Sequence, residues 1–182
     1  MKKVIFLFAL LMSISFAKAQ QQPSVERSIS GVQLGIPTLR VYYEVRLSNN
    51  FSLRAEAGVN SAFWWYHTLF EEGFSFVFFP EFSIQPRWYY NLNRRNERGR
   101  DISNNAANFI KINTIIAPDW MIGGDEDTFV GSVAFIPTWG IRRNIGNRFE
   151  YEAGMGIGYG FNFDGGWNGV VFRPHLRIGY RF

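Results

Sequence analysis

The chain contains no cysteine and only two histidines among its 182 residues, and this shortage limits its chemistry. Without cysteine there are no disulfides, no thiol nucleophile and none of the common structural zinc sites. A mechanism that uses histidine as a base has only His67 and His175 to draw on. We therefore expect stability to come from backbone pairing and side-chain burial, and we expect no cofactor.

Strong net charge and long apolar runs are also missing. The formal charge of +4 includes Lys2, Lys3 and Lys18, and without these three the remaining 16 of the 19 basic residues balance 15 acidic ones. Nucleic-acid binding requires a strongly basic, clustered surface, so we expect no nucleic-acid partner. Beyond the first residues, no apolar stretch approaches the roughly 20 residues of a transmembrane helix.

The first residues have the pattern of a secretory leader. Two lysines precede an apolar run that ends at Phe16, and Ala17-Lys18-Ala19 supplies a small-x-small cleavage pattern. We predict a signal peptide over residues 1–19 and one mature domain over residues 20–182, beginning at Gln20. The alternative, a buried N-terminal helix, fits the lysines and the cleavage pattern less well.

The mature chain alternates between apolar and polar side chains with a period of two, which is typical of strands with one buried face. From Phe149 to Phe161, the odd positions are aromatic or aliphatic and the even positions are glutamate or glycine. The alternation and the intervening turn residues predict eight strands. They lie at about 30–36, 39–47, 51–60, 74–90, 108–118, 129–142, 149–161 and 170–182. Pro37 leaves open whether the first strand is separate from the second.

Eight such strands without a helix-period segment predict an all-β fold, an eight-stranded antiparallel transmembrane β-barrel. Aromatic residues make up 18% of the chain and fall near both strand ends, as two interfacial belts would. The predicted periplasmic belt is Phe51, Trp88, Tyr90, Phe109, Trp139, Phe149, Tyr151, Tyr180 and Phe182. The predicted outer belt is Trp64, Trp65, Tyr66, Trp120, Tyr159, Phe161 and Trp167. A soluble lipocalin-type barrel is the alternative, but its interior would have to hold more aromatic bulk than eight strands enclose.

The last residues, Leu176-Arg-Ile-Gly-Tyr-Arg-Phe182, place apolar side chains at every second position and end in phenylalanine. This resembles the terminal strand by which assembly machinery recognises outer-membrane barrels. The mature chain is similar to small OmpA-type or OmpX-type barrels of Gram-negative bacteria, and to a largely uncharacterised family of such barrels. Segments 88–95 and 137–146 are the most family-specific. The resemblance implies an outer-membrane location, contact with outer-membrane lipids, and assembly through the strand that ends at Phe182. It implies no activity.

If the apolar faces point outward, the polar faces place many charges inside the barrel. We predict a lumen network of ion pairs at Arg40, Glu44, Arg54, Glu56, Arg87, Glu150, Glu152, Arg177 and Arg181. The same faces place further lumen charges at Arg46, Glu81, Lys111, Arg142 and Arg173. Charges in a closed lumen need partners, because an uncompensated buried charge is strongly destabilising.

Hairpin geometry predicts which of these charges pair. Folding the chain back about its first periplasmic turn sets Glu44 directly opposite Arg54. Folding back about a loop between Phe161 and Val170 sets Glu150 opposite Arg181. Glu152 and Arg177 then lie diagonal to this pair.

Other candidate sites have weaker support. His67, near Ser61, Glu71 and Glu72, is the candidate base of a lipid-modifying hydrolase or acyltransferase, although an interfacial role is favoured. His175 is expected to belong to the lumen network. Asp125-Glu126-Asp127, with Asp119, offers oxygen ligands for calcium but lacks EF-hand spacing, so a solvated loop is favoured. The glycines at 154, 156, 158 and 160 do not match a phosphate-binding loop and instead leave room on the inward face.

The loop Asn91 to Asn105 is long for the periplasmic side, where turns are usually short. It carries Arg94, Arg95, Arg98 and Arg100, which suggests contact with a periplasmic partner or the cell wall. The alternative is a flexible solvated turn, which the scattered Asn and Gly favour.

These patterns predict a non-enzymatic outer-membrane barrel with a charge-filled lumen, which is structural or interacts through its extracellular loops. A lipid-modifying enzyme and a narrow channel or small-ligand binder remain the alternatives. Bilayer conductance separates the channel from the others.

Overall fold

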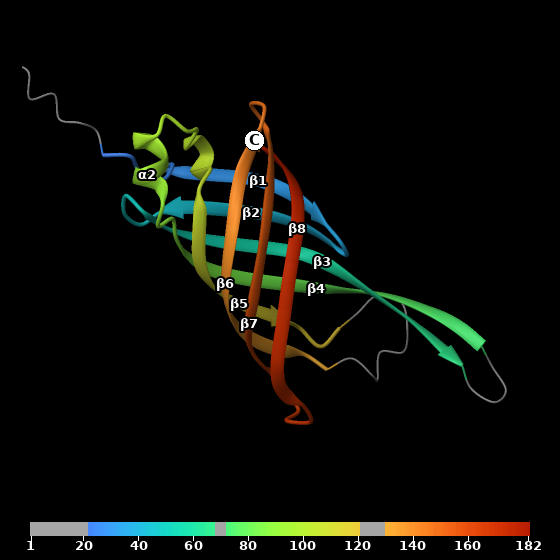
Figure 1. Ribbon diagram of the computed structural model, residues 1–182. Coiled ribbons are helices and arrows are strands. Elements are labelled where there is room, and N and C mark those ends of the chain that lie inside the picture. Colours follow the sequence, from blue (N-terminus) through green and yellow to red (C-terminus); the bar gives the residue numbers. More distant parts are fainter. Residues whose placement is uncertain (1–21, 68–71, 121–129) are drawn as a thin grey trace, which may run out of the picture.

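The computed structural model describes residues 22–67, 72–120 and 130–182, so the predicted leader over residues 1–19 lies outside the described residues. Eight antiparallel strands pair in sequence order, and the last strand also pairs with the first, which closes the barrel (Figure 1). The strands are β1 (Ser28–Gly35), β2 (Thr38–Arg46), β3 (Phe51–His67), β4 (Glu72–Trp88), β5 (Asn108–Ala117), β6 (Ser132–Ile145), β7 (Phe149–Asn162) and β8 (Asn168–Arg181). The predicted all-β, eight-stranded antiparallel barrel is confirmed.

The two ends of the barrel differ, and we name them for what they hold. The terminus end holds the start of β1, the end of β8 and three connections, at 47–50, 89–107 and 146–148. The loop end holds the connections at 36–37, 68–71, 118–131 and 163–167. Pro37 lies in the two-residue turn that joins β1 to β2, so these two strands are separate.

The strands β3 and β4 are longer than predicted. They pair without interruption from Phe51↔Trp88 to His67↔Glu72, so most of the stretch between the predicted strands at 51–60 and 74–90 is strand. Figure 1 shows this hairpin projecting past the other strands at the loop end. The sequence hides the extension because residues 63–66 are four aromatics in a row, without alternation.

The connection between β4 and β5 is folded, so the predicted flexible turn is wrong. It contains the helix α2 (Leu92–Glu97) and the 3₁₀ turn η1 (Ser103–Asn105). A helix of six residues is too short to give a detectable helical period. A buried apolar cluster lies here and is formed by Val25, Tyr89, Leu92, Ala107 and Phe109. We call residues 89–107, together with Val25, the terminal cap.

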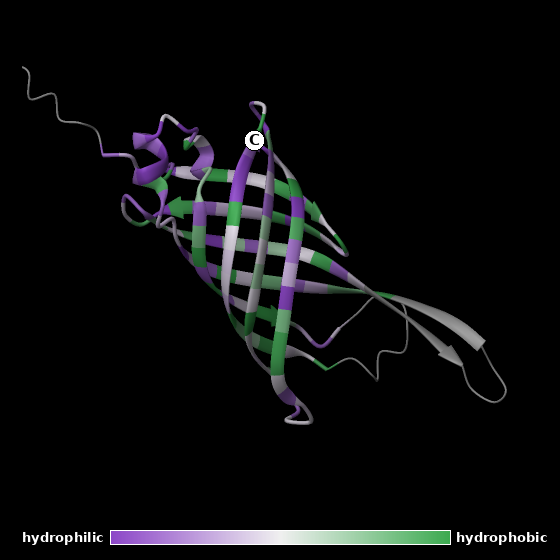
Figure 2. Cartoon of the chain, in the orientation of Figure 1, coloured by the Kyte–Doolittle hydropathy of each residue, from purple (hydrophilic) through white to green (hydrophobic). Residues whose placement is uncertain are grey.

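The polarity of the barrel is inverted with respect to a soluble protein. Apolar side chains on every strand face outward, and charged side chains are buried inside. Figure 2 shows the resulting hydrophobic and hydrophilic bands along the strands. The lipocalin-type alternative requires the apolar faces inside, so it does not fit.

Aromatic residues are exposed near both ends of the barrel. Around the terminus end they include Phe51, Trp88, Tyr90, Trp139 and Phe149. Around the loop end they include Trp120, Tyr159, Phe161 and Trp167. The side chains of Trp64, Trp65 and Tyr66 lie outside the described part of the structure. Among the belt members that are described, Phe109 is placed wrongly: it points into the lumen, is fully buried and packs against Tyr89 of the terminal cap. No described helix has the length and apolar character needed to cross a bilayer.

Candidate functional site: the lumen network

All nine residues of the predicted lumen network point into the barrel, and each is at most 4% exposed. Alternation along each strand explains this placement, since every second residue faces inward. Among the described residues, the buried lumen cations are Arg40, Arg54, Arg87, Lys111, Arg142, Arg177 and Arg181. The buried lumen carboxylates are Glu44, Glu56, Glu81, Glu150 and Glu152. The network therefore fills the lumen with interleaved charges of both signs.

The layer of the network nearest the terminus end is built around Arg142 of β6. Its guanidinium nitrogens lie 2.9 Å from Oε2 of Glu44 and 2.8 Å from Oε2 of Glu150. Arg181 also contacts Glu150, at 3.2 Å. The hydroxyl of Tyr42 accepts a hydrogen bond from Arg142 at 2.7 Å and donates one to Glu150 at 2.8 Å. Side chains from β2, β6, β7 and β8 are thus tied together across the lumen.

The middle layer joins two further carboxylates to three arginines. Arg87 of β4 donates to both oxygens of Glu152 on β7, at 2.8 and 3.0 Å, which is a bidentate pair. Glu56 of β3 lies 2.7 Å from Nε of Arg54 and 3.1 Å from Nη1 of Arg177. Arg54 also approaches Glu152, at 3.4 Å. Both carboxylates therefore contact more than one cation, and the layer spans the barrel.

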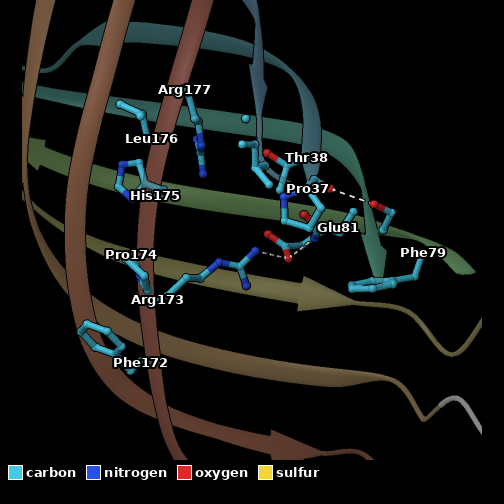
Figure 3. A pocket seen from close by; sticks show the side chains of 14 residues that line it. Pro37, Thr38, Phe79, Glu81, Phe172, Arg173, Pro174, His175, Leu176 and Arg177 are labelled. Carbon is cyan, nitrogen blue, oxygen red and sulfur yellow. Dashed lines mark hydrogen bonds and ion pairs between the residues drawn. The ribbon is translucent and has the colours of Figure 1, made fainter. Parts of the chain in front are cut away.

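The layer nearest the loop end is smaller and more open. Glu81 of β4 lies 2.5 Å from Nη2 of Arg40 and 2.6 Å from Nη2 of Arg173. A cavity of about 260 Å³ opens beside it, between the β1–β2 turn and β8. Figure 3 shows Arg173 reaching across this cavity to Glu81, with His175 and Arg177 farther along β8. The side chain of Arg173 is 29% exposed, so this layer is in contact with solvent.

Neutral polar side chains complete the network, and sequence reasoning missed them. Gln33 donates to Glu150 at 2.7 Å and accepts from Arg54 at 2.7 Å, so it bridges two layers. Gln85 accepts from Lys111 at 3.0 Å. Both glutamines lie at inward positions of the strand alternation, so parity could have identified them. Their role depends on cross-lumen distances that the sequence does not contain.

The terminal cap also reaches into the network. Tyr89 donates a hydrogen bond to Oε1 of Glu44 at 2.8 Å, and Nδ2 of Asn105 donates to the same oxygen at 2.8 Å. Ser52 adds a third donor, at 2.7 Å. Glu44 is therefore satisfied from the strands and from the cap together. No sequence pattern marks Asn105, because it comes from an irregular connection.

The predicted pairing is correct for the first hairpin and wrong for the last. Glu44 is opposite Arg54 in the register, and their side chains approach within 3.8 Å. In the last hairpin Glu152, not Glu150, is directly opposite an arginine, Arg177. Glu150 is opposite Gly179 instead.

The error in the last hairpin has a simple cause. β8 begins at Asn168, which pairs with Phe161, so the register of the hairpin is shifted by two residues from the predicted one. This shift moves Arg181 to a diagonal position, from which it still reaches Glu150. The prediction for Arg46 is also wrong: Arg46 is the last residue of β2, and its side chain is exposed rather than buried in the lumen.

Of the two candidate histidines, His175 lies in the lumen as predicted and approaches a carboxylate of the network. His175 points inward, with Nε2 3.4 Å from Oε1 of Glu152. Gly154 makes room for it, because a Cβ there would lie 2.7 Å from Cε1 of the imidazole. The side chain of His67, at the end of β3, and residues 125–127 lie outside the described residues. No cluster of three metal-ligating side chains occurs among the residues that are described.

Comparisons with protein-family models, with curated proteins and with solved structures returned no match.

Proposed function

We propose that this chain is an outer-membrane β-barrel of the small OmpA or OmpX type, exported by a cleaved leader in a Gram-negative envelope. The observation that carries the proposal is the inverted polarity of the barrel. Outward apolar side chains in contact with water would be strongly unfavourable, whereas lipid solvates them. A closed barrel also satisfies every inter-strand hydrogen bond, which a membrane demands. Aromatic residues at both ends match the two interfaces.

The proposed role is non-enzymatic, either structural or through the loops at the loop end, which would face the cell exterior. The charge-filled lumen supports this role over that of a pore. Ion passage would require Arg142 and Arg87 to leave carboxylates that they contact from across the barrel, while the guanidinium of Arg54 stacks 3.6 Å from the ring centre of Tyr42. Separating buried pairs is expensive, so we expect the barrel to stay closed.

The membrane proposal is tested by fractionation and by gel mobility. The mature protein should begin at Gln20, sediment with outer membranes, and migrate differently before and after boiling, because a closed barrel resists unfolding in detergent. Mass spectrometry of the purified protein checks its N-terminus. Recovery from the soluble periplasmic fraction would refute the proposal.

Delivery to the membrane is proposed to depend on β8. Phe182 is 82% exposed and follows a strand with an alternating outward face, which is the arrangement expected of a segment presented to the barrel assembly machinery. Phe182→Ala should therefore reduce the amount of assembled barrel in cells. Refolding of the purified variant into detergent should be unchanged, because Phe182 lies beyond the end of the strand.

A small-ligand role has one specific observation in its favour, the cavity of about 260 Å³ beside Glu81. Planar-bilayer recordings test both open-lumen alternatives together. A closed barrel gives no steady conductance, whereas a narrow channel gives discrete steps. A ligand that enters the cavity would change the chemical shift of His175, which lines it. The lipid-modifying alternative predicts loss of an acyl-transfer or hydrolase activity in His67→Ala.

A further inference from the structure

A second cavity lies outside the lumen, where the terminal cap meets the strands. Its volume is about 320 Å³. Five arginines line it, and we call it the arginine pocket: Arg94, Arg95, Arg98, Arg100 and Arg143. Four come from the cap, and the fifth comes from the end of β6. Such a density of guanidinium groups is a feature to be explained, because like charges repel one another.

The arginines of the pocket form no ion pairs with the described residues. Arg94, Arg98 and Arg100 form no ion pair and no side-chain hydrogen bond with any described residue. Arg95 is 91% buried, and its Nε has no hydrogen-bond partner in the described part of the chain. Its Nη2 donates to the backbone oxygen of Asp101 at 2.8 Å, which is a neutral acceptor. Burial and the nearby Arg100 lower the pKa of Arg95 below its ordinary value and outweigh the opposite effect of Asp101.

The framework of the pocket is fixed in advance of any ligand. Arg143 donates to the backbone oxygen of Arg142 at 2.7 Å and to Oδ1 of Asn108 at 2.5 Å. The backbone nitrogen of Asn108 donates to Oδ1 of Asn91 at 2.8 Å. These contacts tie the cap to β5 and β6, so Arg143 and the backbone that carries the other arginines are held in place before an anion binds.

The pocket is on the lipid-facing side of the barrel. Tyr90, Asn108 and Arg143 each line it, and each is one residue away from a neighbour that points into the lumen. The hydroxyl of Tyr90 accepts a hydrogen bond from Nε1 of Trp139 at 2.9 Å, and its ring contacts Trp88 edge to face. All three aromatic residues belong to the exposed belt at the terminus end. Such belts lie at the level of the lipid headgroups.

We propose that the arginine pocket binds the phosphate of an anionic phospholipid headgroup in the inner leaflet of the membrane. Guanidinium groups match phosphate oxygens with paired hydrogen bonds, and several of them suit a group that carries a full negative charge. The level of the pocket favours a lipid over a soluble phosphate or the cell wall, because the headgroup is already there. Basic pockets at the membrane surface hold lipid headgroups in this way. This inference rests on the proposed membrane location.

The test compares two triple variants of the full mature barrel in neutral detergent. One is Arg94→Gln, Arg98→Gln and Arg100→Gln, which removes three exposed charges from the pocket. The matched control is Arg27→Gln, Arg46→Gln and Arg148→Gln, which removes three exposed charges from the same end but outside the pocket. Both should keep the heat-dependent gel shift, which shows that they fold.

The probe is dihexanoyl phosphatidylglycerol, titrated calorimetrically below its micelle concentration. We expect the pocket variant to bind it about tenfold more weakly or worse, since charge-assisted hydrogen bonds are lost, and the control to bind as the wild type does. Equal binding by all three proteins would overturn the site. Inorganic phosphate binding as tightly as the lipid would instead assign the pocket to a soluble phosphate. If the pocket variant alone no longer binds isolated cell wall, and its lipid binding is unchanged, the pocket would be assigned to the cell wall.

The two proposals fail in different ways. A protein that fractionates with outer membranes but shows no pocket-dependent lipid binding refutes the site and leaves the membrane barrel. A protein absent from the membrane fraction refutes the proposed function, whatever it binds in detergent.

Discussion

Charged side chains are stabilised differently in the two halves of the lumen. Near the terminus end, Arg142 and Glu44 are fully buried and each contacts several groups, including groups from the terminal cap. Near the loop end, Arg173 meets Glu81 beside an open cavity and stays partly exposed. Exposure to solvent stabilises the charges at the loop end, whereas contacts with other side chains stabilise them at the terminus end. We therefore expect the charges at the two ends to differ greatly in how much they contribute to stability.

The difference also bears on what the network is for. A buried ion pair is weak evidence of net stabilisation, because desolvation offsets much of the attraction. A buried ion pair does, however, make a wrong strand register unfavourable. A strand that slips by one residue turns its charges outward, toward lipid. We therefore expect the buried charges near the terminus end to help fix the register of β2, β6 and β7.

Removing Arg142 should have the largest effect on the free energy of unfolding. Arg142→Gln leaves Glu44 and Glu150 without their shortest cationic contacts, at 2.9 and 2.8 Å, inside a closed lumen. We expect a loss of about 3 to 5 kcal/mol in the free energy of unfolding, as for other buried charges that lose a partner. Urea unfolding in detergent, followed by tryptophan fluorescence, measures it. A loss under about 1 kcal/mol would mean that water already reaches this layer.

Opening the terminal cap should have the next largest effect. Leu92 is fully buried between Val25 and Phe109. Leu92→Ala removes this packing and leaves a cavity, for which we expect a loss of about 2 to 3 kcal/mol. The same unfolding assay measures it, and Leu34→Ala on the exposed outer face is the control. Equal losses in both variants would show that the cap adds nothing particular to stability.

A double-mutant cycle tests which arginine interacts more strongly with Glu44 near the terminus end. Oε2 of Glu44 is 2.9 Å from Arg142 but 3.8 Å from Arg54, although Arg54 is its direct partner in the register. We therefore expect Glu44→Gln to couple more strongly to Arg142→Gln than to Arg54→Gln, by about 1 kcal/mol or more within the usual range of contact couplings. Cycles of unfolding free energy measure both couplings. The reverse order would show that strand register, and not the cross-lumen contact, decides the interaction.

The same contrast explains how far the sequence predicts this protein. Period-two alternation predicts which residues face inward, so it placed Glu44, Arg87 and Glu152 in the lumen. It does not predict contacts across the lumen, because these depend on barrel closure and on the lengths of the connections. A register shift of two residues in the last hairpin was enough to place Gly179, and not Arg181, opposite Glu150. The sequence does not predict the terminal cap, because its helix is short and its buried residues follow no period.

At the loop end, removing a charge should matter little. Arg173→Gln takes one cation from Glu81, but Arg40 remains 2.5 Å away and Asn60 donates a hydrogen bond to the same carboxylate. We expect a loss of less than about 1 kcal/mol, because the pair is partly exposed and screened by solvent. The unfolding assay at low and high salt checks both the size and the screening. A loss as large as that of Arg142→Gln would remove the distinction between the two halves.

The smallest expected effect is a dependence of the terminal cap on pH. Burial alone would raise the pKa of Asp101, but hydrogen bonds from Ser103 and Asn144 outweigh it and hold this pKa below the ordinary value. Asp101 accepts from the hydroxyl of Ser103 at 2.6 Å and from Nδ2 of Asn144 at 2.6 Å, so the carboxylate ties the cap to β6.

A carboxyl group whose pKa is lowered on folding stabilises the folded form above its unfolded pKa, and this contribution is lost as the pH falls through the folded pKa. The cap should therefore loosen slightly as the pH drops below the ordinary value of about 3.9. Protease cleavage within residues 89–107, followed from pH 5 downward with an acid-stable protease, measures the loosening. Asp101→Asn should flatten this dependence while leaving cleavage at the loop end unchanged. If cleavage at the two ends rises in parallel, the pH response belongs to the whole barrel and not to the cap.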